Sequence, residues 1–259
     1  MKARFFISLL ALGMASSIKG AVVPILPTDF NDGSRIETFT FESDGPATKA
    51  HIYLPESYGE NKNLPTIYLI DFTEQHFKMA RDEFAQVIAA VRKFNKEALV
   101  ITLNEILDID AEPQSFEIHF QMYRDLVSAV DAKYSTDSSR TLIGKGSESG
   151  LVMMALFTET PETSLFDNFI ATDPSGHYAT AILNQIENEN IAYPKSNKKL
   201  HFSFTSSNDY PKCSKIIGSI EEAAFPWLEF KSEKYRDRTY ENAYPHAYAE
   251  AIEVVFESE

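Results

Sequence analysis

Polar and apolar residues alternate along two short stretches near the start of the chain, residues 35–41 and 49–55. Alternation with a period of two is typical of a β-strand that buries one face. The sequence Ser43-Asp44-Gly45-Pro46 lies between the two stretches and favours a turn. The pattern therefore predicts an antiparallel pair of strands at the start of the fold.

After residue 65 the pattern changes to short, continuous apolar runs, which are typical of strands buried on both faces of a parallel sheet. The predicted strands are residues 66–71, 98–103, 140–144, 169–173, 200–204 and 227–230. Apolar residues at helical spacing between these runs predict helices at residues 77–94, 116–133, 151–157, 178–188, 212–224 and 245–256. Strands that alternate with helices predict an α/β fold with a mostly parallel central sheet, antiparallel N-terminal strands and helices on both faces.

The first 20 residues have the features of a secretory signal peptide. Lys2 and Arg4 precede an apolar run, residues 5–15, that is too short to span a bilayer, and small residues follow it. We therefore expect an exported protein, periplasmic or extracellular, that is not inserted in a membrane once the signal is removed. The rest of the chain, residues 21–259, has no linker or repeat and is predicted to form a single domain.

Composition excludes several kinds of partner and site. The formal net charge is −14, whereas nucleic acids and anionic membranes require a basic surface. The six histidines are scattered without metal-ligand spacing, and no glycine-rich phosphate loop is present, so neither a metal nor a cofactor is expected. Cys213 is the only cysteine, so no internal disulfide can form, and a packed or semi-exposed free thiol is the interpretation we favour over a catalytic one. The oligomeric state is left open.

A strand, a turn of small residues and an apolar helix follow one another between Arg140 and Leu156. This order is typical of a nucleophile elbow, in which a tight strand-to-helix turn exposes a serine hydroxyl above a parallel sheet.

The chain also resembles the esterase branch of the α/β-hydrolases, which includes S-formylglutathione hydrolase, enterochelin esterase and the mycolyltransferases. The segments that carry this resemblance are residues 64–71, 104–113, 120–134, 140–144, 150–161 and 165–167, together with Asp173-Pro174-Ser175. The resemblance covers most of the mature chain and implies an α/β-hydrolase fold. It also implies a serine nucleophile, a histidine base and a carboxylate that orients the histidine.

The position of the nucleophile depends on how the family pattern Gly-x-Ser-x-Gly-Gly is aligned. Counting forward from the strand places the serine position on Gly146, whereas counting back from the helix places it on Ser147. The turn is therefore predicted to carry one extra residue, with Lys145 where a small residue is expected. Ser147 is the predicted nucleophile, and Ser149 is the alternative. These serines could instead only cap the helix.

The base and the acid are harder to place. The family's histidine position falls on Tyr240, whose phenol, with a pKa of about 10, is not a base at neutral pH. His246 is the predicted base, with a capping or surface histidine as the alternative interpretation, and Tyr240 and His177 are further candidates. Asp209, which follows the strand at residues 200–204, is the predicted acid, although an ordinary turn would have the same sequence.

The oxyanion hole would use the backbone N–H groups of Phe72 and Glu148. Two hypotheses follow from these assignments. The first is an exported serine esterase that cleaves a small carboxylic ester or thioester through an acyl-serine intermediate, and the resemblance favours it. The second is a catalytically degenerate hydrolase-fold protein that binds a ligand or partner without triad chemistry, and the residues at Tyr240 and Lys145 favour it.

Overall fold

The structure is a computed structural model. It describes residues 32–43, 47–60, 63–71, 77–103, 113–160, 162–174, 176–188, 197–206 and 210–256. The predicted signal peptide lies outside the described residues.

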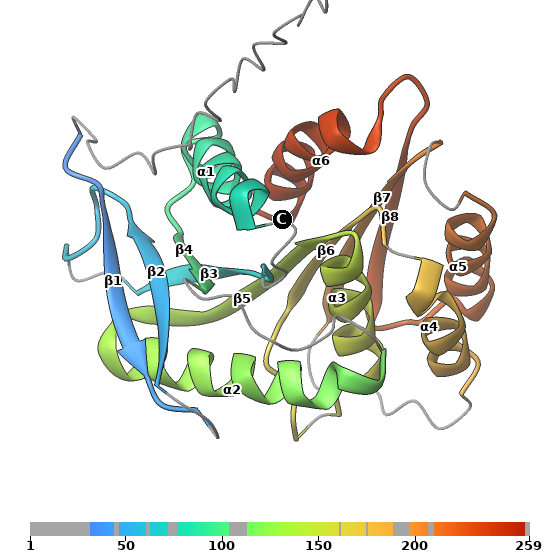
Figure 1. The fold of residues 1–259 in the computed structure, drawn as a ribbon, viewed down its shortest axis with the longest axis horizontal. Helices are drawn as coiled ribbons and strands as arrows, with labels where there is room; N and C mark the ends of the chain where they lie inside the picture. The colour runs from blue at the N-terminus through green and yellow to red at the C-terminus, as the bar shows by residue number, and fades with distance from the viewer. Residues whose placement is uncertain are drawn as a thin grey trace, which may run out of the picture.

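Eight strands form one sheet in the order β1-β2-β4-β3-β5-β6-β7-β8 (Figure 1). The strands are β1 (Arg35–Phe41), β2 (Thr48–Leu54), β3 (Leu64–Leu69), β4 (Leu99–Leu103), β5 (Thr136–Lys145), β6 (Asn168–Thr172), β7 (Lys198–Thr205) and β8 (Leu228–Tyr235). The pairs β1–β2 and β2–β4 are antiparallel, and every other pair is parallel. The predicted mostly parallel sheet with an antiparallel opening is confirmed.

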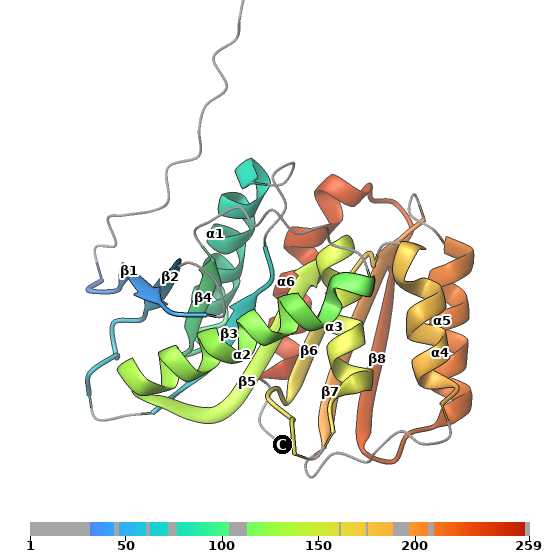
Figure 2. The same ribbon diagram turned by 60° about the horizontal axis from the view of Figure 1, so that its bottom comes forward.

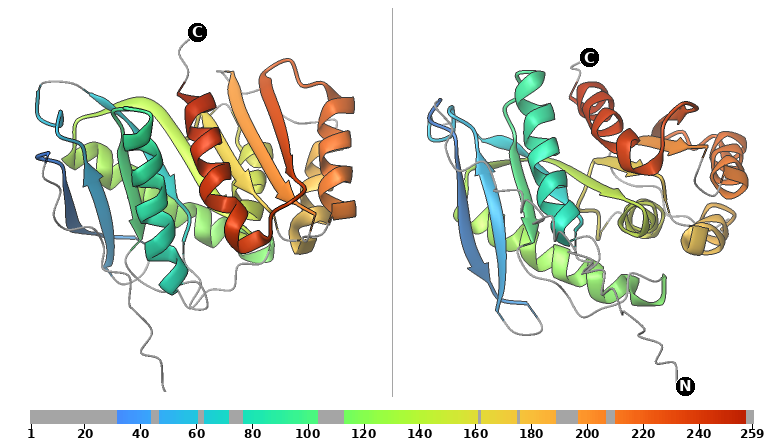
Figure 3. Two further views of the ribbon diagram at one scale, coloured as in Figure 1. Left: turned by 90° about the horizontal axis from the view of Figure 1, so that it is seen from above. Right: turned by 45° about the horizontal axis from the view of Figure 1, so that its top comes forward.

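Helices cover both faces of this sheet, as predicted. They are α1 (Phe77–Lys93), α2 (Phe116–Lys133), α3 (Ser147–Thr158), α4 (Ala179–Ile186), α5 (Tyr210–Ala223) and α6 (Tyr240–Val255). Helices α1 and α6 lie side by side on one face (Figure 3) and pack with Ile67, Val100 and Ile170 of the strands. Helices α2, α3 and α4 lie on the other face (Figure 2), where a larger apolar cluster includes Leu151, Phe169 and Cys213 of α5. The thiol of Cys213 is buried, as expected.

Several element boundaries differ from the predictions, by four residues or more at the starts of β5 and α3, the end of β8 and the start of α6. Strand β8 continues to Tyr235, beyond the end that was predicted. The prediction ended early because β8 alternates between partly buried and exposed residues and lacks the continuous apolar run that marks the inner strands. Helix α6 begins at Tyr240, although the helix was predicted to start at Pro245. The N–H of Thr239 donates to Asn242 Oδ1 at 2.9 Å and fixes this earlier start. Pro245 lies inside the helix and removes one helical N–H donor there.

No helix in the described part of the chain is long and apolar enough to cross a membrane.

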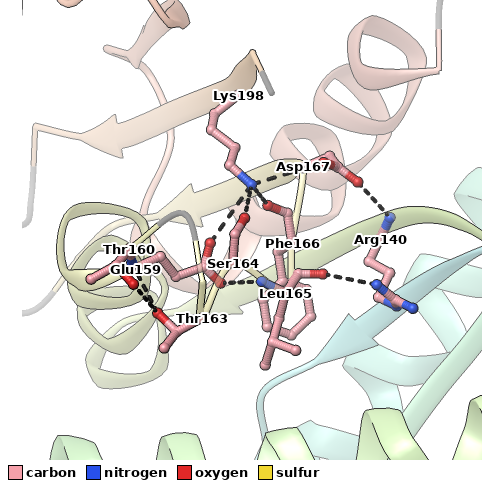
Figure 4. A network of polar contacts seen from close by, with 9 residues as sticks. All are labelled: Arg140, Glu159, Thr160, Thr163, Ser164, Leu165, Phe166, Asp167 and Lys198. Atoms are coloured by element: carbon pink, nitrogen blue, oxygen red, sulfur yellow. Dashed lines mark hydrogen bonds and ion pairs between the residues drawn. The ribbon is translucent and has the colours of Figure 1, made fainter. Parts of the chain in front are cut away.

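The loop between α3 and β6 is held in place by a buried lysine at the start of β7 (Figure 4). Lys198 Nζ donates to Ser164 Oγ at 2.5 Å and to the carbonyl oxygen of Phe166, and it lies 3.7 Å from a carboxylate oxygen of Glu159. Burial raises the pKa of Glu159 to about 7. This network fixes the far end of α3, the helix that follows the candidate elbow.

His201 on β7 is buried, and neither of its ring nitrogens has a hydrogen-bond partner among the described residues. Burial lowers its pKa to about 4, and the nearby charge of Lys231 lowers it further while Glu250 opposes the shift. The folded protein therefore strongly favours the neutral imidazole.

This shift predicts a loss of stability in acid. The folded-state pKa of about 4 lies below the ordinary value of 6.5, so the unfolded chain binds more protons between these values. Stability from the neutral His201 is full above pH 6.5 and falls as the pH drops towards 4. The free energy of unfolding falls by roughly 3 kcal/mol in this way, because each pKa unit corresponds to about 1.4 kcal/mol. Urea unfolding of His201→Leu across this pH range should show a flatter dependence than wild type. The exposed-site control His246→Gln should retain the wild-type slope, and an unchanged slope in His201→Leu would contradict this account.

Candidate functional site

The strand-to-helix turn of the predicted elbow is present and sharp. Strand β5 ends at Lys145 and α3 begins at Ser147, so Gly146 alone forms the apex of the turn. Gly146 has φ 64° and ψ −122°, in the positive-φ region that glycine adopts at little cost. Its N–H donates to the carbonyl oxygen of Thr172 at 2.9 Å, and its own carbonyl accepts from the N–H of Gly150 at 3.2 Å. The predicted extra residue in this turn is wrong.

Gly144 provides the close approach that an elbow requires. A Cβ atom at this position would lie 2.9 Å from the backbone carbonyl carbon of Glu148 and 3.0 Å from its oxygen. The small residue two positions before the apex is therefore Gly144, and the expectation that Lys145 occupies this place is also wrong. Counting back from the helix placed the family's serine position one residue too late, on Ser147. The first turn of α3 is polar, so its sequence has no apolar spacing that marks where the helix begins.

The candidate serines lie beyond the apex. Ser147 is the first residue of α3 and is partly exposed, and no described hydrogen bond involves its hydroxyl. Ser149 is fully buried, and its Oγ has no partner within the described residues. Glu148 is also buried, and its N–H belongs to the first helical turn, whose N–H groups have no acceptor within the helix.

The remaining predicted site residues are not joined to Ser147 in the described structure. His246 is exposed in the second turn of α6, and no hydrogen bond joins it to Ser147. His177 is exposed in a short 3-10 turn before α4. Tyr240 is the first residue of α6, but its side chain is outside the described part of the structure. Phe72 and Asp209 lie outside the described residues, so the triad and the oxyanion hole stay predictions.

A buried ion pair lies directly behind the turn, and sequence reasoning missed it. Lys145 Nζ is 2.6 Å from Glu83 Oε1, and the two side chains are 1% and 7% exposed. Tyr248 donates its hydroxyl to Glu83 Oε2 at 3.0 Å, and Lys145 Nζ lies 4.0 Å from the ring centre of Tyr244. The pair thus connects the last residue of β5 to α1 and to α6.

Two further carboxyl groups face this pair. Burial raises the pKa of Asp71, which follows β3, well above its usual range, and the charges of Glu83 and Glu148 raise it further. Burial also raises the pKa of Glu83, although Lys145 opposes this shift. The region behind the turn is therefore acidic, with one lysine facing three carboxyl groups. Among the described residues no group of three or more His, Cys, Asp or Glu is arranged to hold a metal ion.

No protein-family model and no curated protein matches the sequence. Solved structures do share its fold. An IroE-like serine hydrolase from Shewanella oneidensis has a TM-score of 0.72 at 15% identity, covering 86% of this chain and 80% of that one. The siderophore hydrolase EstB from Aspergillus nidulans has a TM-score of 0.67 at 15% identity, covering 92% and 97%. A ferulic acid esterase has a TM-score of 0.60 at 12% identity, covering 86% and 97%.

The chain has an α/β-hydrolase fold. At these identities the likeness establishes the fold alone, and the activity has to be argued from the residues at the turn.

The close approach at Gly144 predicts that even one added methyl group is costly. Gly144→Ala should lower the free energy of unfolding by about 1–3 kcal/mol, because the new Cβ would overlap the backbone of Glu148. Gly218→Ala is the matched control, because a Cβ there meets nothing within 4 Å and the residue lies inside α5. The control should be neutral or more stable by about 0.5–1 kcal/mol. Equal effects of the two substitutions in chemical denaturation would show that the turn is not tightly packed.

The buried ion pair predicts strong coupling between its two partners. Lys145→Met and Glu83→Leu should each cost about 3–5 kcal/mol, since each leaves a buried charge without its partner. The double variant should lose much less than the sum of the two single losses. The measurement is a double-mutant cycle by urea unfolding near pH 7. Additive losses would mean that the two side chains are not energetically coupled.

Proposed function

We propose that this protein is an esterase-like member of the α/β-hydrolase fold that binds a small molecule at the β5–α3 turn without acyl-serine chemistry. The observation that carries this proposal is the glycine at the apex, Gly146. In an elbow the nucleophile occupies the apex, because that position pushes its side chain out above the sheet. Gly146 has no side chain to do so.

The neighbouring residues support the same conclusion. Ser147 belongs to the first turn of α3, one residue beyond the apex. Lys145, the residue before the apex, is directed into a buried ion pair. The position where the family carries its histidine is Tyr240, and a phenol with a pKa of about 10 cannot take a proton from serine near neutral pH.

The features that suit binding are retained. The first N–H groups of α3 have no acceptors within the helix and lie at the carboxyl edge of the sheet. Such groups bind a carbonyl or carboxylate oxygen. A small carboxylic ester, or a compound of similar shape, is therefore the ligand class that we propose. The sequence features of residues 1–20 support export of the protein to the periplasm or the cell exterior.

A serine esterase is the second candidate, and two observations favour it. Ser147 is partly exposed beside the apex, and the solved structures with this fold include proteins named as serine hydrolases and esterases. In this alternative Ser147 is the nucleophile, His246 the base and Asp209 the acid, with the N–H groups of Phe72 and Glu148 as the oxyanion hole.

A single probe, methyl butyrate, separates the two candidates. We expect saturable shifts of the backbone amide resonances of residues 146–149 in the labelled mature protein, with hydrolysis no faster than in buffer. Ser147→Ala should leave both results unchanged. In contrast, turnover that falls by on the order of 10³-fold or more in Ser147→Ala would establish the esterase, since a nucleophile accounts for at least that much of the rate. Absence of both amide shifts and hydrolysis would reject both candidates for this ester class.

A further inference from the structure

The loop between β8 and α6 concentrates positive charge in an acidic protein. Lys234, Arg236 and Arg238 fall within five positions, although the chain as a whole carries a net charge of −14. They line an open hollow of about 630 Å³ together with Tyr235, Asp237 and Asn242. The charged residues of the lining are therefore three basic residues and one acidic residue, Asp237.

The two arginines of this hollow differ from other arginines of the described structure. Arg35, Arg92 and Arg140 each form an ion pair with a carboxylate, at 2.8, 2.6 and 2.6 Å. Arg236 and Arg238 form no ion pair and no side-chain hydrogen bond in the described part of the protein. Among the described residues, therefore, no side chain takes up the N–H donors of these two guanidinium groups.

The loop is held at both ends, so these side chains project from a fixed frame. Tyr235 pairs with Thr205 at the end of the β7–β8 ladder, and its hydroxyl donates to Glu250 Oε2 on α6. On the other side the N–H of Thr239 bonds to Asn242. The backbone between these anchors spans only three residues, which limits how far the arginines can move apart.

The hollow lies at the same edge of the sheet as the candidate turn. Strands β5, β6, β7 and β8 are parallel, so their carboxyl ends point the same way, and Gly146 follows β5 just as the basic loop follows β8. Three strand spacings of about 4.8 Å separate β5 from β8, which is roughly 14 Å along the sheet. A small organic molecule bound at the turn can span this distance.

We propose that the β8–α6 hollow binds the anionic end, a carboxylate or phosphate group, of the ligand that occupies the β5–α3 turn. Guanidinium groups recognise these oxyanions through paired N–H donors, and Lys234 adds a further positive charge. The acidic remainder of the protein repels anions at long range, so this local reversal of charge selects where an anion can bind. The inference rests on the proposed function, because it assigns the second half of the same ligand site.

The test compares two probes of the oxyanion, inorganic phosphate and succinate, by NMR titration of the labelled protein at low ionic strength. We expect saturable shifts of the amide resonances of residues 234–238. The double variant Arg236→Gln/Arg238→Gln should bind at least tenfold more weakly. The matched control Lys212→Gln/Lys215→Gln alters the charge equally at exposed positions on α5 and should bind as wild type does. The probe that binds more tightly identifies phosphate or carboxylate as the preferred group.

Equal weakening in the two double variants, or shifts that never saturate, would overturn the proposal in favour of diffuse surface charge. Methyl butyrate carries no anion, so its effect on residues 146–149 should survive in Arg236→Gln/Arg238→Gln. Binding of methyl butyrate without any binding of phosphate or succinate rejects this inference and leaves the proposed function standing. The reverse result supports the oxyanion site while rejecting the ester ligand at the turn.

Discussion

The ion pair between Lys145 and Glu83 is the constraint on which the candidate site depends. Two charges are removed from water there, and close geometry, the hydroxyl of Tyr248 and the ring of Tyr244 offset their desolvation. The pair joins the end of β5 to α1 and α6, on the face of the sheet opposite to α3. Two contacts therefore hold the turn at Gly146. One is the ion pair of Lys145 on the face of α1 and α6, and the other is the close approach of Gly144 to the backbone of Glu148 in α3.

This arrangement sets what the turn can do chemically. A serine hydrolase needs a base beside its nucleophile, whereas the titratable groups placed behind this turn are mainly acids. Burial raises the pKa of Asp71 and of Glu83, and Glu83 is already engaged in the ion pair with Lys145. The side chain of Lys145 points into the protein, where it forms the ion pair with Glu83. The described residues thus place no hydrogen-bonded general base next to Ser147.

The sheet could be predicted from the sequence because every residue of inner strands such as β4 and β6 is buried, which leaves a continuous apolar run in the sequence. The alternating opening pair and the continuous apolar runs correspond directly to half-buried and fully buried strands. The same signal is absent where polar residues are buried. Glu83, Lys145 and Glu148 would be expected at the surface, but they are buried, and contacts between residues far apart in the chain hold Glu83 and Lys145 there. The count from the strand to Gly146 was correct because strand residues have fixed spacing, whereas the polar start of α3 displaced the count from the helix.

A glycine at the apex also changes the energetics of the turn. A serine held at positive φ is strained, and a strained nucleophile persists where catalysis maintains it. Gly146 adopts φ 64° without that strain, so the shape of the turn does not depend on a strained nucleophile. In the function proposed above, recognition rests on the first N–H groups of α3 and on the two arginines after β8 that have no ion pair among the described residues. A glycine at the apex is therefore compatible with an intact turn whose first helical N–H groups lie at the carboxyl edge of the sheet.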